Sequence, residues 1–324
     1  MRILVTYPVA LLSAAVTTAV SLPFWRRWSR QSGAIDEPGD RKIHSTPIPL
    51  AGGLAVMTGL AVPLLAGAAV AAVYSRFTIP GLFEYGLGKR ALQIVGIMVG
   101  ALGMLLIGLR DDLVELRPAI KFGAQLVVAL MVAATGIRIT LFVPSLAFSY
   151  GVTALWILTV VNAFNFMDNM NGLCTGIGAI GAASFGLIAS SQGQYLVAAM
   201  AFLIAGALAG FLPYNFPRAT AFLGDAGSHL TGFLLGVLAI LPHFYSAKHR
   251  HPLAVLTPLL VLAVPLADLI WVVILRCKAG KPFYIGDTNH LSHRLVRRGL
   301  DPARAVLLIW LLSAAAGALA ILLQ

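Results

Sequence analysis

The chain has 324 residues, of which 59% are hydrophobic and only 11% are charged, and its mean hydropathy is +0.89. No soluble globular domain is built this way, so the composition indicates a polytopic membrane protein. The formal net charge of +11 does not indicate a nucleic-acid partner, because basic residues beside membrane spans set orientation and bind anionic lipid, and no nucleic-acid-binding motif accompanies them.

Ten apolar windows of about 20 residues, the length that crosses a bilayer, divide the chain. The first window, 3–24, is longer than the apolar core of a signal peptide and is followed at once by Arg26, Arg27 and Arg30, which favours an uncleaved span. We therefore predict an all-α polytopic integral membrane protein, one domain over 1–324, with ten transmembrane helices and both termini on the outer side. The remaining windows are 50–74, 91–109, 119–135, 150–167, 174–192, 195–212, 228–241, 253–275 and 303–323.

Charged residues divide the loops between these windows into two sets. Most of the 23 basic residues fall in one set, which the positive-inside rule places in the cytoplasm. Of the 12 acidic residues, only Glu84 falls on the outer side and only Asp268 falls well inside a span. Outer loops also face water, so solubility does not require this asymmetry. It predicts a site on the cytoplasmic face of a cell membrane, assembled from several inner loops.

The first inner loop is rich in Pro, Gly and charged residues. It holds Lys42 and His44, followed by two prolines and a Gly-Gly pair that leads into the second window. A basic loop that touches anionic lipid is one interpretation. The prolines and glycines favour another, in which a fixed and closely packed chain holds Lys42 and His44 against a phosphate.

Two adjacent carboxylates, Asp111 and Asp112, close the third window. Such neighbours repel each other unless a cation, a proton or water lies between them, and a solvated loop end would satisfy them as well as a site would. Lys121 and Gln125 lie one helical turn apart at the start of the fourth window.

Polar residues also follow one face of the fifth window at its end. Those that fall within about 120° of one helix face, at 100° per residue, are Asn162, Asn165, Asp168 and Asn169. Asn162 and Asn165 still lie in an apolar run, where a polar face is expensive. They are therefore expected to line a cavity or to hydrogen-bond to another helix.

The stretch 222–228, Phe-Leu-Gly-Asp-Ala-Gly-Ser, places one carboxylate between two glycines at the start of an apolar segment. Gly224 and Gly227 would let backbone N–H groups approach an anion, and Asp225 is expected at a membrane surface rather than in the middle of the bilayer. An ordinary interhelical turn capped by Asp is the alternative. Asn215 lies shortly before this stretch.

The last polar stretch predicts a short helix with Asp287 or Thr288 as its N-cap and Gly299 at its C-terminal end. The residues that would share one face of this helix, as a cationic strip of the kind that binds phosphates, are His290, His293, Arg294 and Arg297. No third soft ligand accompanies the two histidines, so a zinc site is not expected.

Asp268 follows Pro265 inside the ninth window. A carboxylate within the membrane is a functional candidate by default. The alternative, which we favour, is a structural role in which Asp268 is paired to a neighbouring helix.

An inner face that binds a nucleotide-linked donor and a lipid phosphate would bring together two anions. A Mg²⁺ ion held by one or two carboxylates and by phosphate oxygens would offset this charge, with Mn²⁺ as the alternative ion. Asp225 is the best-placed ligand. Phosphoryl transfer then requires positioning and charge neutralisation, which the Lys, Arg and His residues of the other loops can supply.

Taken in order, these stretches resemble the polyprenyl-phosphate N-acetylhexosamine-1-phosphate transferases. This family includes UDP-N-acetylglucosamine:undecaprenyl-phosphate enzymes and phospho-N-acetylmuramoyl-pentapeptide transferases. The resemblance covers nearly the full chain, and the Pro-Ile-Pro and His-Leu-Ser-His-Arg-Leu stretches are closer to the N-acetylglucosamine branch. The motifs that carry it are Asp40-Arg41-Lys42-x-His44 with Pro-x-Pro-x-x-Gly-Gly, Asp111-Asp112, Asn162-x-x-Asn165-x-x-Asp168, Phe222-x-Gly224-Asp225-x-Gly227-Ser228 and His290-x-x-His293-Arg294.

The resemblance implies a Mg²⁺-dependent transfer of a sugar 1-phosphate from a UDP-N-acetylhexosamine to undecaprenyl phosphate, with release of UMP, at the start of lipid-linked cell-envelope polysaccharide synthesis. It implies that Asp225 binds the metal and that Asp111 and Asp112 act on the lipid phosphate. The catalytic set that it implies is completed by Asp168, His290 and His293. The substrate contacts that it implies are Lys42, His44, Lys121, Asn162, Asn165, Asn171, Asn215 and Arg294. A homodimer is left open.

Three residues depart from the family pattern. Many bacterial members have Asp-Gly-x-Asp-Gly-Leu where this chain has Asn169 and Asn171, so a second carboxylate is missing, and Ser292 stands where many members have a middle histidine. The alternative within the family is phospho-N-acetylmuramoyl-pentapeptide transfer in peptidoglycan synthesis. Two alternatives from other classes also stay open. A transporter or flippase would place its polar residues near the bilayer midplane and show repeated halves. A catalytically inactive scaffold would follow if these departures had disabled the site.

Overall fold

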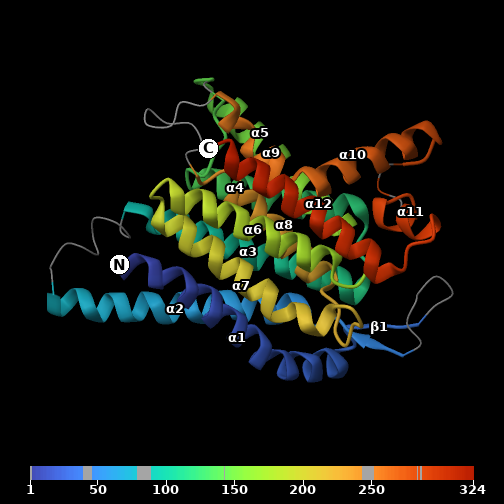
Figure 1. The fold of residues 1–324 in the computed structure, drawn as a ribbon, viewed down its shortest axis with the longest axis horizontal. Helices are drawn as coiled ribbons and strands as arrows, with labels where there is room; N and C mark the ends of the chain where they lie inside the picture. Colours follow the sequence, from blue (N-terminus) through green and yellow to red (C-terminus); the bar gives the residue numbers. More distant parts are fainter. Residues whose placement is uncertain are drawn as a thin grey trace.

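The computed structural model describes residues 2–38, 46–78, 89–141, 143–242, 252–282, 284 and 287–324. Within them the protein is a bundle of helices, and it also contains one small two-stranded sheet (Figure 1). The predicted helical membrane class is therefore confirmed. The predictions for Lys42, His44 and Glu84 lie outside the described residues. The helical elements are α1 (Arg2–Ser32), α2 (Gly52–Thr78), α3 (Lys89–Val114), α4 (Pro118–Ala134), α5 (Leu146–Met167), α6 (Leu173–Ser191), α7 (Tyr195–Asn215), α8 (Gly224–Leu238), η2 (Pro252–Leu256), α9 (Thr257–Val261), α10 (Ala263–Lys278), α11 (Leu291–Arg297) and α12 (Pro302–Leu322).

Each predicted window coincides with one helix, except 253–275, which is divided among η2, α9 and α10. Seven of the helices in the described part of the chain are long and apolar enough to cross a membrane. The number becomes eight if Ala254–Val261 and Ala263–Lys278, which are bent by 68° at their junction, form one span. The helices α4 and α8 are shorter, with 17 and 15 residues. The count of ten spans therefore stays a prediction, as does the outer location of the termini, which lie at the same end of the bundle (Figure 1).

The first helix extends further than the apolar window that predicts it. It continues through Arg26, Arg27 and Arg30 and ends at Ser32, before Gly33, whose φ of +80° is a conformation that favours glycine. A helix leaving a membrane needs no apolar residues in its last turns. These arginines therefore lie on α1 and not in a loop.

The centre of the bundle is α8. All of its side chains except Asp225 are buried, because α2, α3, α5, α6 and α7 pack around it. A helix that is apolar on all sides is stable only when protein or lipid surrounds it completely. The one charged residue of α8 therefore stands at the start of the most enclosed helix.

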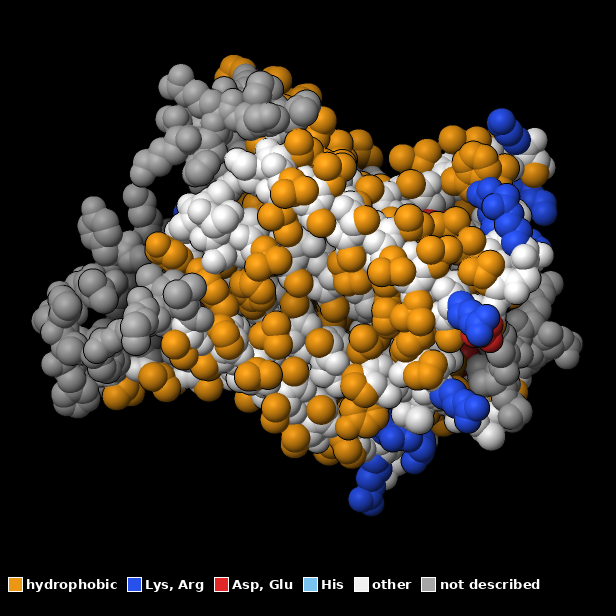
Figure 2. Space-filling model, viewed as in Figure 1, with side chains coloured by type: hydrophobic (Ala, Val, Ile, Leu, Met, Phe, Trp, Pro, Cys, Tyr) orange, Lys and Arg blue, Asp and Glu red, His pale blue; other side chains and the backbone are white. Residues whose placement is uncertain are grey.

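The outer surface separates apolar flanks from a basic end. Apolar side chains cover the flanks in Figure 2, while the visible Lys and Arg side chains gather at the end where α11 and β1 (Ile35–Asp36) lie in Figure 1. This distribution follows the predicted grouping of basic residues in one set of loops.

Candidate active site

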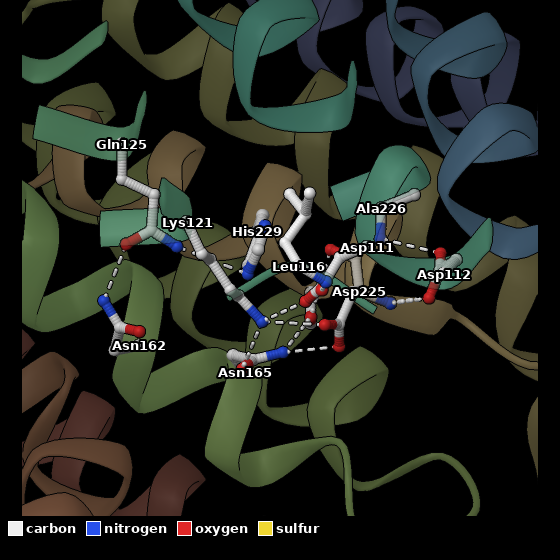
Figure 3. A network of polar contacts seen from close by, with 11 residues as sticks. Asp111, Asp112, Leu116, Lys121, Gln125, Asn162, Asn165, Asp225, Ala226 and His229 are labelled. Carbon is white, nitrogen blue, oxygen red and sulfur yellow. Dashed lines mark hydrogen bonds and ion pairs between the residues drawn. The ribbon is translucent and has the colours of Figure 1, made fainter. Parts of the chain in front are cut away.

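Four helices bring polar side chains together where α3 and α5 end and where α4 and α8 begin (Figure 3). The Nζ atom of Lys121 lies 2.6 Å from Oδ2 of Asp111 and 2.7 Å from Oδ2 of Asp225. Asn165 donates from Nδ2 to Oδ1 of Asp225 at 2.7 Å. We call these four residues the carboxylate centre. One ammonium lies there between the carboxylates of Asp111 and Asp225, not between the adjacent Asp111 and Asp112.

Asp112 has a different environment from its neighbour Asp111. Its two carboxylate oxygens accept the backbone N–H groups of Asp225, at 2.8 Å, and of Ala226, at 3.0 Å (Figure 3). The first N–H groups of a helix have no partner within that helix, so Asp112 caps α8 from the end of α3. Asp111 instead accepts the N–H of Leu116 at 2.6 Å and faces Lys121. Asp112 therefore caps a helix, whereas Asp111 belongs to the carboxylate centre.

Close backbone contacts hold Asp225 in place. A Cβ atom at Gly108 would lie 2.2 Å from the carbonyl oxygen of Asp225, so only glycine lets α3 approach α8 this closely. Gly224 has a φ of +72°, which lets the chain turn into α8 immediately before Asp225. Gly108 therefore serves helix packing, and Gly224 serves the turn.

The Pro-x-Pro-x-x-Gly-Gly segment lies against the start of α8. Its strand β2 (Ile48–Pro49) pairs antiparallel with β1, and the N–H groups of Gly52 and Gly53 donate to the carbonyls of Phe222 and Leu223 at 2.9 and 3.1 Å. The closely packed start of this span is therefore confirmed. Its partner is the chain that leads to Asp225, a pairing that the local sequence pattern does not reveal.

Asp168 lies beside the carboxylate centre but not on a helix face. Helix α5 ends at Met167, and Asp168 is its C-cap residue, so the prediction that Asp168 and Asn169 continue the polar face of α5 is wrong. A short turn follows, and Gly172, with a φ of +74°, is the N-cap residue of α6. Burial raises the pKa of Asp168 well above its ordinary value, and the carboxylates of Asp225 and Asp112 raise it further.

A second polar layer lies one helical turn from the carboxylate centre. Asn162 donates from Nδ2 to Oε1 of Gln125 at 3.0 Å, and Nε2 of Gln125 lies 3.4 Å from Nε2 of His229 (Figure 3). Gln125 and His229 are fully buried. The expectation that Asn162 hydrogen-bonds to another helix is confirmed. The contribution of His229 was missed, because one histidine in an apolar run carries no pattern of its own.

A cavity of about 490 Å³ opens from the carboxylate centre between α4, α5 and α10. Its polar side includes Asp111, Lys121, Asn162, Asn165 and Asp225, together with Glu115 and Thr159. Its other side is apolar and includes Leu155 and Leu158 of α5 and Val273 of α10. The cavity can therefore take a ligand that has a charged end and an apolar end.

The short helix of the last polar stretch begins later than the sequence predicts. Its N-cap is His290, not Asp287 or Thr288. The carboxylate of Asp287 is already used, because it accepts the N–H of Asn289 and the Nε–H of Arg276, both at 2.9 Å. Although burial opposes ionisation of Asp287, these two donors lower its pKa.

The predicted cationic strip is held by several different partners. Nδ1 of His290 lies 2.7 Å from Oδ2 of Asp268, Arg294 stacks 4.8 Å above the ring of Trp271, and Arg297 donates to a backbone carbonyl. The rings of His290 and His293 are 6.3 Å apart. Burial lowers the pKa of His293, and the neighbouring His290 and Arg297 lower it further. The pairing of Asp268 with a neighbouring element is confirmed.

Two predicted substrate contacts lie outside the carboxylate centre. Asn215 is buried, and its Oδ1 accepts the N–H of Gly172 and the hydroxyl of Thr175, each at 3.0 Å. Asn171 donates to the carbonyl of Pro217 at 3.2 Å. Both amides connect the turn before α6 to the segment after α7. Their contacts with substrate stay predictions.

Two of the departures from the family pattern contact each other. The hydroxyl of Ser292 donates to Oδ1 of Asn169 at 2.6 Å, and Nδ2 of Asn169 donates to the carbonyl of Phe166. The residues at 169 and 292 therefore share one hydrogen bond between α11 and the turn after α5.

Arg276 was also missed as a structural residue. Its side chain is 2% exposed, and its guanidinium lies 4.7 Å from the centre of the Phe166 ring. In the sequence, an arginine at the end of an apolar window is typical of an ordinary cytoplasmic loop.

Comparisons with known proteins identify a family and several relatives. Residues 94–243 match the family described as Glycosyl transferase family 4. The chain is 31% identical to the "Probable undecaprenyl-phosphate N-acetylglucosaminyl 1-phosphate transferase" of Bacillus subtilis, with 96% of this chain and 82% of that protein aligned. It is 32% identical to the "Decaprenyl-phosphate N-acetylglucosaminephosphotransferase" of Mycobacterium tuberculosis, over 93% and 78%. It is 27% identical to the "Undecaprenyl-phosphate alpha-N-acetylglucosaminyl 1-phosphate transferase" of Escherichia coli, over 99% and 85%.

Proposed function

Because this chain belongs to glycosyl transferase family 4, we propose that it transfers N-acetylglucosamine 1-phosphate from UDP-N-acetylglucosamine to undecaprenyl phosphate and releases UMP. The observation that carries this proposal is the carboxylate centre at the end of a cavity that also has an apolar side. The aligned relatives named for N-acetylglucosamine support this sugar over phospho-N-acetylmuramoyl-pentapeptide. The product would start the assembly of a lipid-linked cell-envelope polysaccharide.

The donor set of the carboxylate centre fits a hard divalent cation. Asp111 and Asp225 contribute carboxylate oxygens, Asn165 contributes an amide oxygen, and both carboxylates already lie within 2.7 Å of one cationic atom, Nζ of Lys121. Among the described residues no three His, Cys, Asp or Glu side chains form a metal cage, but Mg²⁺ needs only one or two carboxylates besides phosphate oxygens. Asp225 would hold Mg²⁺, or alternatively Mn²⁺. The bound ion would neutralise charge on the donor pyrophosphate.

The transfer itself needs little help from a base. A lipid phosphate monoester is already anionic at pH 7, so one of its oxygens can attack the phosphorus that carries the sugar directly. A new P–O bond forms to the lipid phosphate, and the bond from that phosphorus to the UMP oxygen breaks. Lys121 supplies positive charge beside this reaction, and Asp111 holds its ammonium in place at 2.6 Å.

The cavity supports a polyprenyl phosphate as the acceptor. A phosphate near Lys121 would leave the first isoprene units beside Leu155, Leu158 and Val273, which line the apolar side. The burial of these units would stabilise the complex by about 25 cal/mol per Å² of apolar area. The lipid bilayer then supplies this substrate from the flank of the bundle.

The location of the carboxylate centre supports an enzyme on the cytoplasmic face rather than a carrier. It lies at helix ends and not midway along the spans, and the basic end of the molecule in Figure 2 is the end that the positive-inside rule assigns to the cytoplasm. A carrier places its polar site near the midplane. The active site would therefore meet a soluble nucleotide donor on the inner face of the cell membrane.

The test is UMP release by the detergent-purified chain with undecaprenyl phosphate, Mg²⁺ and, separately, UDP-N-acetylglucosamine, UDP-N-acetylgalactosamine and UDP-N-acetylmuramoyl-pentapeptide. We expect release with UDP-N-acetylglucosamine that requires the lipid, is abolished by EDTA and is restored by Mg²⁺. No release with any donor, from protein that is monodisperse and helical by circular dichroism, would contradict the proposal. UMP release with only one of the other donors would mean that the sugar of that donor is the one transferred.

A further inference from the structure

The ammonium of Lys121 contacts the same oxygens that fit a divalent cation. Its Nζ atom lies 2.7 Å from Oδ2 of Asp225, 2.6 Å from Oδ2 of Asp111 and 3.4 Å from Oδ1 of Asn165. Oxygens from three side chains therefore face one positive atom. The chain thus carries a cation of its own at the oxygens that the proposed function assigns to a metal ion.

An ammonium and a metal ion cannot both use Oδ2 of Asp225 without strong repulsion. A Mg²⁺ ion lies about 2.0–2.1 Å from its oxygen ligands. Because Nζ of Lys121 is 2.7 Å from Oδ2, an ion bound to that oxygen would lie less than about 5 Å from Nζ in any direction of approach. Two cations at that separation in a partly buried site repel each other. One of them must therefore move away when the other binds.

The contacts of Asp225 indicate which partner can leave. Its Oδ1 accepts from Nδ2 of Asn165 at 2.7 Å, and the same nitrogen also donates to the hydroxyl of Ser228 at 3.0 Å, so this amide is held at two points. Lys121 instead carries its charge on a flexible four-carbon stem and has Asp111 as a second partner. Lys121 can therefore release Asp225 and stay beside Asp111.

A phosphate in the cavity is the group that would draw this ammonium away. Lys121, Asp111 and Asp225 all line the cavity, so an anion that enters it reaches Nζ directly. Hydrogen bonds between an ammonium and a phosphate are charge-assisted, as are those between an ammonium and a carboxylate. A phosphate can therefore replace Asp225 as the partner of Lys121, which leaves Oδ2 of Asp225 to a metal ion.

We propose that Lys121 is an internal counter-ion that competes with the metal ion for Asp225 and gives way when a substrate phosphate binds its ammonium. This inference rests on the proposed function, because it concerns the metal ion and the phosphates of that reaction. Metal and phosphate then bind cooperatively, since each favours the arrangement in which Lys121 has left Asp225. The carboxylate centre would therefore take up its metal ion mainly together with substrate.

Binding of Mn²⁺ to the detergent-purified chain, measured by the EPR signal of the free ion, tests this competition without turnover. Lys121→Met removes the ammonium and keeps a side chain of similar length. In the absence of substrates, we expect this variant to bind Mn²⁺ at least about 10-fold more tightly than the wild type. The matched control is Lys278→Met, which removes an exposed lysine at the end of α10 and should bind Mn²⁺ within about twofold of the wild type.

A double variant locates the ion. When Asp225→Asn is added to Lys121→Met, the gain in Mn²⁺ affinity should disappear, because the oxygen that the ammonium had occupied no longer carries charge. A gain that persists without the carboxylate of Asp225 would place the ion elsewhere and overturn the proposal.

The wild type supplies the second test, in two separate arms with undecaprenyl phosphate alone and with UDP-N-acetylglucosamine alone. After subtraction of the Mn²⁺ that each ligand binds without protein, at least one of them should tighten Mn²⁺ binding about 10-fold. The same ligand should have a smaller effect on Lys121→Met, in which only direct contact between phosphate and metal remains. The arm that shows the effect identifies the phosphate that binds Lys121.

Two results would overturn this proposal. The first is a Mn²⁺ affinity of Lys121→Met within twofold of the wild type. The second is a wild-type affinity that neither ligand changes, which would count even if Lys121→Met failed to fold. Both results come from binding and leave UMP release by the wild type to be judged separately. An absence of UMP release would instead contradict the proposed function.

Discussion

Two of the Asp side chains that the structure pairs with a nitrogen-bearing side chain differ in access. Asp225 faces Lys121 in the carboxylate centre and keeps 32% of its side chain exposed, whereas Asp268 faces His290 and keeps 1%. The first pair lines a cavity, whereas the second is enclosed by protein and Asp268 bonds only to His290 and Leu291 at the start of α11. Access, more than residue type, therefore separates a carboxylate that a ligand can reach from one that holds a neighbouring helix.

The largest expected effect comes from removing the exposed carboxylate. Asp225→Asn should lower UMP release by about 10³-fold, because it removes the proposed ligand of the cation at the reacting phosphate. Its thermal stability in detergent should change little, since Lys121 keeps Asp111 as a partner. The matched control is Asp301→Asn, which changes the exposed N-cap of α12 and should leave turnover unaffected. Retention of more than a tenth of the activity by Asp225→Asn would end the comparison as stated.

The support beneath Asp225 is the next target. Gly108→Ala would place a Cβ atom 2.2 Å from the carbonyl oxygen of Asp225, and should destabilise the protein by about 1–3 kcal/mol and reduce turnover. Gly123→Ala in α4 is the control, because nothing lies within 4 Å of its added Cβ atom. Thermal unfolding and UMP release of both variants check this. Equal melting temperatures for the two would show that the close approach of α3 and α8 can relax freely.

The hydrogen bond between Asn169 and Ser292 tests how α11 is held against the turn after α5. Asn169→Ala and Ser292→Ala should each destabilise the protein by about 1 kcal/mol, and the double variant should lose less than the sum, because both single changes remove the same hydrogen bond. A double-mutant cycle of unfolding free energies measures this coupling. Strict additivity would mean that the two departures from the family pattern are independent of each other.

The smallest effect is expected from Asp287, which is paired with Arg276 before α11. Its folded-state pKa is lowered, so its ion pair contributes stability above the ordinary Asp value of 3.8 and loses that contribution as pH falls through the folded pKa. The melting temperature of the wild type should therefore be higher than that of Asp287→Asn at pH 7. This difference in melting temperature should shrink below pH 3.8. A difference that grows on acidification would have the wrong sign for this pair.

Local sequence patterns predicted the elements well because helix formation in a membrane depends on long apolar runs. Every window of this kind coincides with a helix or with the bent series that ends in α10. The patterns failed where chain geometry changes over a few residues, as at the end of α5 and at the start of α11. A tight turn through Gly172 follows α5, and the carboxylate of Asp287 is bound to Arg276 instead of capping α11.

The sequence alone determined which residues carry charge, which segments are apolar, and the order of the polar motifs, since these properties belong to the chain itself. The tertiary structure alone decided how those motifs meet. Lys121 and Asp225 are 104 positions apart, and the same is true of Gln125 and His229. It also decided that Asp111 faces a cation while Asp112 caps a helix, and that Asp268 is paired with His290. The physical reason is that such contacts are made when helices pack, and each depends on close approaches, such as that of Gly108 to Asp225, between distant parts of the chain.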